Sequence, residues 1–310
     1  MKRKTGDYLT LALKGMAMGA ADVIPGVSGG TIAFITGIYE ELVNSIKSVN
    51  MSALQLLFTG RLQSFWKTVN GNFLISVLAG IGISIFSLAK GLEYLLHHYP
   101  ILVWSFFFGL ILASAIYVGR TIKKWNTGTL LSGIAGIVTA YFITIISPAE
   151  ANTSGWFIFI SGAIAICAMI LPGISGSFIL VLLGMYKFIL SAVGDLNIPV
   201  LLVFIAGAAL GIIAFSNLLS WLLKNYHWLT IAVLTGFMVG SLNKVWPWKQ
   251  VTETFTGRHG EIMPLNEKNI LPGAYEQISG NEAWLLGAIL LALAGFTTIF
   301  VVEGLTKKKK

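Results

Sequence analysis

The sequence predicts an all-α, polytopic membrane protein built from two repeats of inverted topology. Of the 310 residues, 55% are hydrophobic and only 11% are charged, and the mean hydropathy is +0.80. A soluble domain carries about 25% charged residues, so this composition excludes an ordinary soluble enzyme. Apolar runs long enough to cross a bilayer recur along the chain. An interrupted apolar stretch with a Pro-Gly centre occurs twice.

The first interrupted stretch covers residues 8–47 and contains Pro25 and Gly26 near its middle. Proline lacks a backbone donor and clashes with the preceding turn, and glycine favours turns and helix ends. We therefore expect two arms that meet at a tip rather than one continuous helix. Arms too short to span form a re-entrant hairpin whose tip is buried in protein or lines a cavity.

Uninterrupted apolar spans follow this stretch, and the second half of the chain repeats the order. The first half, residues 1–150, has spans at 72–89, 101–118 and 129–146. The second half, residues 151–310, has an interrupted stretch at 156–194, with Pro172 and Gly173 at its tip, and spans at 199–222, 228–245 and 284–303. We expect six full crossings plus two hairpins, or ten crossings if the hairpin arms also span.

The basic residues of the loops set the expected orientation. Both chain ends are basic, and so are the linker at 40–71 and the loop at 119–128. Cytoplasmic loops of membrane proteins carry an excess of Lys and Arg. We therefore expect both termini in the cytoplasm and the long 246–282 segment outside. That segment has Trp246 and Trp248 at its start, which suit a membrane interface, and it forms either a lid or a surface loop.

The two halves match residue by residue. Around the tips, Pro25, Gly26, Ser28, Gly29, Gly37 and Tyr39 recur in the same spacing as Pro172, Gly173, Ser175, Gly176, Gly184 and Tyr186. Further on, Gly80 and Gly109 match Gly207 and Gly236, and near the start Gly15 matches Gly162. Because each half has three full crossings, the second copy enters the membrane upside down. This architecture is common in secondary transporters, whose substrate sites lie near the midplane. Coincidence between glycine-rich segments is the alternative.

The tips have the chemistry of an anion site. Ser28 suits a helix N-cap, with Gly29, Gly30 and Thr31 in the first turn. The first N–H groups of a helix have no partner within it, and the helix dipole favours negative charge there. The second tip repeats the design with Ser175, Gly176 and Ser177. We expect a phosphate or carboxylate between the two tips. The alternative is that these small residues only allow close helix crossing.

Asp22 lies just before the first tip, where its counterpart in the second repeat is Met169. A carboxylate in a membrane segment is costly and is by default a functional candidate. We expect Asp22 to tune the anion site or to carry a coupling proton. It could instead pair with Lys14 or cap neighbouring backbone.

Catalysis and nucleic-acid binding are not expected. Residues 26–30 satisfy the G-x-S-x-G nucleophile pattern, but a serine nucleophile needs a nearby base. The histidines, His97, His98, His227 and His259, all fall in loops or at span ends. The net charge of +8 is distributed over loops and tails rather than gathered in a nucleic-acid site. We expect no catalytic residue, metal or cofactor.

Residues 19–40, from Gly19 through the first tip to Glu40, resemble the signature of a bacterial membrane family. That family was long classed as a domain of unknown function and is associated with polyprenyl-phosphate translocation, as the PopT-type transporters. The segment 171–177 resembles the second copy of the signature, and the resemblance covers nearly the whole chain.

The resemblance implies return of undecaprenyl phosphate from the outer to the cytoplasmic leaflet of the bacterial inner membrane. There this lipid carrier is reused for envelope synthesis. The phosphate would be held by the amides of Ser28–Thr31 and Ser175–Phe178 while the tail stays in the bilayer with the membrane lipids. A secondary transporter of a small soluble anion is the alternative, and a membrane-embedded hydrolase is a weaker one. The sequence leaves the oligomeric state and the coupling ion open.

Overall fold

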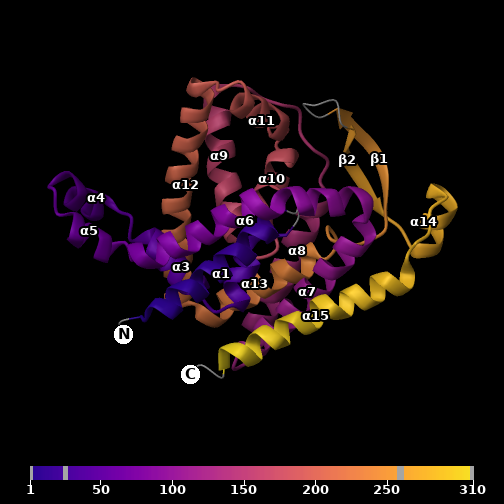
Figure 1. Ribbon diagram of the computed structural model, residues 1–310, viewed down its shortest axis with the longest axis horizontal. Coiled ribbons are helices and arrows are strands. Elements are labelled where there is room, and N and C mark those ends of the chain that lie inside the picture. Colours follow the sequence, from indigo (N-terminus) through magenta and orange to yellow (C-terminus); the bar gives the residue numbers. More distant parts are fainter. Residues whose placement is uncertain (1–2, 24–26, 257–261, 308–310) are drawn as a thin grey trace.

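The computed structural model describes residues 3–23, 27–256 and 262–307 (Figure 1). Within them the protein is helical apart from one β-hairpin. The first half contains α1 (Thr5–Asp22), α2 (Gly29–Ile35), α3 (Tyr39–Lys47), α4 (Met51–Phe58), α5 (Leu62–Thr68), α6 (Gly71–His98), α7 (Pro100–Thr121) and α8 (Thr127–Ile145). The second half contains α9 (Gly155–Ile170), α10 (Gly176–Leu182), α11 (Tyr186–Gly194), α12 (Ile198–Asn225), α13 (His227–Ser241), β1 (Lys249–Thr256), β2 (Ile262–Asn269), α14 (Pro272–Ser279) and α15 (Leu285–Lys307).

The long apolar helices agree with an all-α polytopic membrane protein. Among the described helices, α7, α8, α12 and the 71–88 part of α6 are long and apolar enough to cross a membrane. Helices α9, α13 and the 285–301 part of α15 are apolar but shorter. The span predicted at 228–245 is too long, because α13 ends at Ser241. The chain turns there, and the next residues face the β-hairpin instead of continuing the helix.

Each interrupted stretch has two breaks, where the sequence predicted one. The first break separates α1 from α2 and α9 from α10, as expected. The second separates α2 from α3 at Gly37 (φ +71°) and α10 from α11 at Gly184 (φ +68°). Side chains avoid this left-handed backbone, so glycine suits both bends. Helices α10 and α11 are bent by 113° relative to each other.

Matched glycines make matched helix contacts in the two halves. Helix α1 packs on α6, and α9 packs on α12. A Cβ atom at Gly80 would overlap the carbonyl oxygen of Ala12, and one at Gly207 would overlap that of Phe159. Without side chains at these two positions the helices approach closely, as membrane helices with small residues do. Other helices pair across the halves, α7 with α15 and α8 with α13. The inverted membrane orientation of the two halves stays a prediction.

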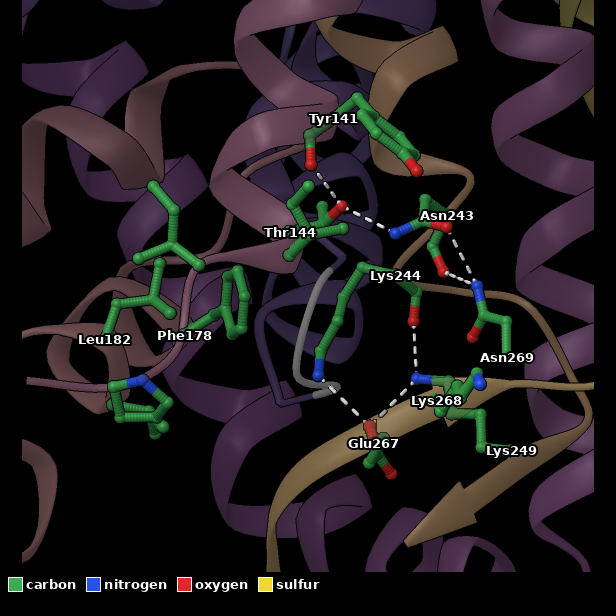
Figure 2. A pocket seen from close by; sticks show the side chains of 14 residues that line it. Tyr141, Thr144, Phe178, Leu182, Asn243, Lys244, Lys249, Glu267, Lys268 and Asn269 are labelled. Atoms are coloured by element: carbon green, nitrogen blue, oxygen red, sulfur yellow. Dashed lines mark hydrogen bonds and ion pairs between the residues drawn. The ribbon is translucent and has the colours of Figure 1, made fainter. Parts of the chain in front are cut away.

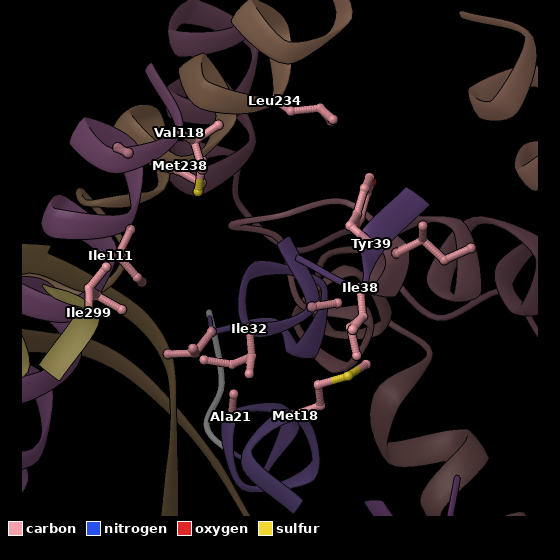
Figure 3. Close-up of a cluster of buried hydrophobic side chains, with 14 of the residues drawn as sticks. Met18, Ala21, Ile32, Ile38, Tyr39, Ile111, Val118, Leu234, Met238 and Ile299 are labelled. Carbon is pink, nitrogen blue, oxygen red and sulfur yellow. The ribbon is translucent and has the colours of Figure 1, made fainter. Parts of the chain in front are cut away.

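One hydrophobic core joins both halves (Figure 3). Met18, Ile32 and Tyr39 come from the first interrupted stretch, and Met238 and Ile299 come from α13 and α15. Each of these side chains is at most 6% exposed. Ile170, at the end of α9, belongs to the same cluster, so both interrupted stretches contribute to one packed interior.

The described parts of the long 246–282 segment are structured rather than a plain loop. It contains the antiparallel strands β1 and β2, followed by α14. Trp246 Nε1 donates to the Ile270 carbonyl at 2.9 Å, and buried Trp248 Nε1 donates to the Ala283 carbonyl at 2.9 Å. The hairpin and α14 lie at the right of Figure 1, whereas the two ends of the chain and the α4–α5 pair lie at the left.

Candidate functional site

The two tips lie against each other. Buried Ser28 donates from Oγ to the Met169 carbonyl at 3.0 Å, and buried Thr31 accepts at Oγ1 from the Gly173 N–H at 3.0 Å. These bonds join residues far apart in the sequence. They place the first turn of α2 beside the break between α9 and α10. The predicted tip residues Pro25 and Gly26 lie outside the described residues, whereas Pro172 and Gly173 are buried.

The amides of the first tip are bonded within the protein. Ser28 caps α2, and its side chain accepts from the Gly30 N–H at 3.0 Å. The Gly29 N–H donates to Asp22 Oδ1 at 2.7 Å. A carboxylate at a helix start is the kind of group that this end of a helix stabilises. The place predicted for the substrate phosphate is therefore held here by the protein's own carboxylate.

Lys14, the alternative partner considered for Asp22, donates to the Thr36 carbonyl at 2.6 Å. At the second tip, Ser175 and Ser177 share a hydrogen bond between their hydroxyls at 2.8 Å. Gly176 packs against α9, because a Cβ there would lie 2.7 Å from the Ala165 carbonyl oxygen. The printed contacts between the tips thus join Ser28 and Thr31 to Met169 and Gly173, whereas Ser175 and Ser177 bond to each other.

A polar pocket of about 310 Å³ opens beside the second tip (Figure 2). We call it the lysine pocket. Its polar wall consists of Thr144, Asn243, Lys244, Lys249, Glu267, Lys268 and Asn269. The other lining residues include Tyr141, Phe178 and Leu182, so α8, α10, the turn after α13 and the β-hairpin all contribute. Pockets of about 300–1,000 Å³ are typical of small-molecule sites.

Two lysines share one carboxylate in this pocket. Glu267 Oε2 accepts from Lys244 Nζ at 3.1 Å and from Lys249 Nζ at 3.0 Å. Lys249 Nζ also donates to the Lys244 carbonyl at 2.7 Å. The Lys249 side chain is only 7% exposed. Burial of an ammonium group is costly unless it has close hydrogen-bonding partners. Glu267 and the Lys244 carbonyl are these partners for Lys249.

Burial and neighbouring charges shift the pKa values of this cluster. Burial lowers the pKa of Lys249 to about 8, although Glu267 partly opposes the change. Burial by itself raises the pKa of Glu267, but Lys249 and Lys244 outweigh it and hold that pKa below its usual range. Glu267 is therefore ionised at neutral pH, and Lys249 changes its charge under mildly alkaline conditions.

A chain of side-chain hydrogen bonds fixes the part of the polar wall that contains no charged residue. Asn269 Nδ2 donates to the Asn243 carbonyl at 2.7 Å and to its Oδ1 at 2.9 Å. Asn243 Nδ2 donates to Thr144 Oγ1 at 2.7 Å. Strand β2, the turn after α13 and the end of α8 are tied together by these bonds, so the pocket has a defined shape.

Phe178 connects the lysine pocket with the second tip. Lys244 Nζ lies 4.8 Å from the centre of the Phe178 ring, a cation–π distance. A cavity of only about 10 Å³ separates these two side chains from Gly173 and Ile174. Such a space holds about one water. The lysine pocket and the second tip are therefore neighbours, with only this small cavity between them.

The lysine pocket is not among the sites predicted from the sequence. The sequence pattern of residues 246–282 indicates a lid or a surface loop, and it predicts no role for Lys244, Lys249 or Glu267. One signal was present in the sequence. Lysines are depleted on the outer side of membrane proteins. Lys244 and Lys249 lie at the start of a segment that is expected outside, so their position indicates a specific role.

The sequence model of a family described as "VCA0040-like: Undecaprenyl phosphate translocase-like" matches residues 18–263. The chain belongs to this family. The match includes both tips, Lys244 and Lys249, and it ends before Glu267. The resemblance seen in the tip motifs is thereby confirmed over most of the chain.

Two curated relatives agree with this membership of the translocase-like family. The chain is 46% identical to a protein of Vibrio cholerae named "Polyprenyl-phosphate transporter", over 99% of this chain and 100% of that protein. It is 33% identical to a Staphylococcus aureus protein of the same name, over 76% of this chain and 85% of that protein. Both names describe transporters, in agreement with the prediction that the chain is not an enzyme. No solved structure matches the chain.

Proposed function

We propose that the protein transports polyprenyl phosphate, and that it returns undecaprenyl phosphate from the outer to the cytoplasmic leaflet of the bacterial inner membrane. The identity of 46% along the whole length of a relative named as a polyprenyl-phosphate transporter carries this proposal. The junction of the two broken helices supports it, because interrupted repeat helices commonly form the substrate site of transporters.

The phosphate passes the junction of the tips by exchange with Asp22. In the present structure the carboxylate of Asp22 occupies the Gly29 amide. A second anion at the same amide would be repelled by this carboxylate. Protonation of Asp22, or its movement away from the tip, frees the Gly29 amide for the lipid phosphate. Binding of the phosphate is thereby coupled to the change at Asp22. Proton coupling through Asp22 is the form of energy input that this arrangement favours.

The test is leaflet exchange in liposomes. Purified protein is reconstituted with labelled undecaprenyl phosphate, and the accessibility of the label in each leaflet is followed with and without a pH gradient. The Ser28→Ala/Ser175→Ala double variant serves as the site variant, and Ser279→Ala, an exposed serine on α14, serves as the control. We expect protein-dependent movement that the double variant slows and the control does not.

A soluble anion is the competing substrate. Protein that is folded and reconstituted, but leaves the lipid in its original leaflet under every gradient, contradicts lipid transport. Uptake of inorganic phosphate by the same liposomes then identifies the soluble-anion alternative.

A further inference from the structure

We infer that the lysine pocket and an apolar groove beside it form the recognition site where the lipid enters: the pocket binds the phosphate monoester, and the groove binds the first isoprenyl units. This inference rests on the proposed function and deepens it by adding a binding site separate from the tips.

The lysine pocket has the charge for a phosphate monoester. Among the described residues that line it are three lysines, Lys244, Lys249 and Lys268, and one glutamate, a surplus of two positive charges. A phosphate monoester carries about −1.5 to −2 charges at neutral pH, with three acceptor oxygens. Lys249 and Lys244 already converge on a single carboxylate oxygen, at 3.0 and 3.1 Å. An incoming phosphate oxygen near Glu267 would be met by the same two donors.

The apolar groove continues from the lysine pocket. It has a volume of about 320 Å³ and shares Tyr141, Asn243 and Asn269 with the pocket. The rest of its lining is apolar and consists of Phe108, Ile137, Val239, Gly240, Leu242 and Trp246. The one polar group among these side chains, the indole N–H of Trp246, is hydrogen-bonded to the Ile270 carbonyl. A small soluble anion has no apolar part that could bind in this groove. A charged pocket that leads directly into an apolar groove fits a molecule with an anionic head and a hydrocarbon tail.

The lysine pocket lies next to the second tip, so we place it before the tips on the path of the phosphate. Phe178 and Lys244 line both the lysine pocket and the small cavity that reaches Gly173. A phosphate in the pocket is thus one constriction away from the junction of the tips. The pocket holds the headgroup first, and displacement of the Phe178 ring opens the way inward.

The test is binding of farnesyl phosphate, a short polyprenyl monophosphate, to the full-length protein in detergent at pH 6.5. Inorganic phosphate and farnesol are measured beside it, to separate the contributions of head and tail. Lys249→Gln and Lys244→Gln each remove one charged donor, and Lys187→Gln on α11, where the lysine is exposed, is the matched control. We expect about tenfold weaker binding for each pocket variant, the usual effect of losing a hydrogen bond to a charged group.

Glu267→Gln separates electrostatics from folding, because it has the opposite expected sign. Removing this acid leaves the pocket more positive, so farnesyl phosphate binds several-fold more tightly. A purely structural cluster would weaken binding in this variant as well. Weaker binding for Glu267→Gln therefore overturns the inference, as does unchanged binding for both lysine variants.

The groove has its own pair of variants. Val239→Phe narrows the groove, and Val138→Phe places the same ring on an exposed position of α8 that does not line it. We expect Val239→Phe alone to weaken farnesyl phosphate and to leave inorganic phosphate unchanged. Equal affinity of the wild type for inorganic phosphate and farnesyl phosphate contradicts the lipid assignment.

Lipid movement measured with the same proteins distinguishes a failed inference from a failed function. Wild-type protein and lysine variants that move undecaprenyl phosphate equally well refute the entry site and leave the proposed function standing. Wild-type protein that binds farnesyl phosphate through the lysines but moves no lipid supports the site and refutes the proposed function.

Discussion

The backbone N–H of Gly29 donates to Asp22 Oδ1 at 2.7 Å, so the carboxylate before the first break caps the helix after it. The break between α1 and α2 is thereby closed by an anion that belongs to the protein. A Cβ atom at Gly29 would lie 2.5 Å from Asp22 Oδ2, and glycine is what permits this contact. The arrangement makes Asp22 the natural competitor of a substrate phosphate at this tip.

Asp22→Asn should uncouple lipid movement from the pH gradient. The amide oxygen still accepts from the Gly29 N–H, but the side chain has no charge to gain or lose. We expect movement of undecaprenyl phosphate without a gradient to persist and its acceleration by a gradient to disappear. Leaflet exchange in liposomes measures both. Asp7→Asn, which changes an exposed carboxylate near the start of α1, is the control. A gradient response of wild-type size in Asp22→Asn contradicts this role.

Gly30→Ala should destabilise the junction of the tips. An added methyl group would overlap the Ile170 carbonyl oxygen, which is backbone and cannot turn aside. We expect a loss of about 1–3 kcal/mol in the free energy of unfolding, as for other overpacked sites. Gly82→Ala on α6 has open space around its new methyl group and should be neutral or stabilising. The two thermal unfolding midpoints in detergent provide the comparison, and equal midpoints would show that the tips are not tightly packed.

Binding of farnesyl phosphate should weaken as the pH rises from 7 to 9. Lys249, whose pKa burial lowers to about 8, loses its proton in this interval. The phosphate changes little, because its second pKa is about 6. Lys249→Arg keeps the charge at every pH in the interval and should flatten the curve. Binding curves at several pH values check this prediction, and an equal decline in both proteins argues against Lys249 as the cause.

The same group makes stability depend on pH with the opposite sign. The pKa of Lys249 in the folded protein is about 8, against an ordinary value of 10.5 for a lysine in the unfolded chain. Between these values the unfolded chain binds more protons than the folded protein, so the free energy of unfolding rises with pH. We expect the difference in stability between wild type and Lys249→Met to shift in favour of wild type as the pH rises across this window. Denaturation of both proteins at pH 7.5 and 10 measures the shift, which vanishes if Lys249 titrates normally in the folded protein.

Trp248→Phe should loosen the β-hairpin without unfolding the helices. The indole Nε1 donates to the Ala283 carbonyl at 2.9 Å, and the substitution leaves this buried acceptor unpaired. The expected cost is about 1–3 kcal/mol. Hydrogen exchange should increase in β1 and β2 and remain unchanged in α7. Trp284→Phe, at a position that is 53% exposed, is the control and should leave exchange in both regions unchanged.

The membrane class, most of the spans and the two broken stretches were predictable because they depend on local patterns. Apolar runs and Pro-Gly interruptions act within a few residues, and each can be interpreted where it stands. The prediction was less accurate where a helix end depends on distant contacts. Helix α13 ends at Ser241 because the turn that follows bonds to Thr144 and Asn269, and no local motif marks that end.

The residues of the two tips, 28–31 and 172–177, could be predicted from the sequence, but the contacts between them could not. That Ser28 bonds to Met169, and that Asp22 rather than an outside anion takes the Gly29 amide, follows from packing between segments far apart in the chain. The lysine pocket is the extreme case. Lys244, Lys249 and Glu267 become one site only when the β-hairpin folds back over the ends of α8 and α10. Local sequence patterns determine which segments enter the membrane, whereas tertiary packing decides which charges meet, because a buried charge is tolerated only where partners from elsewhere in the chain surround it.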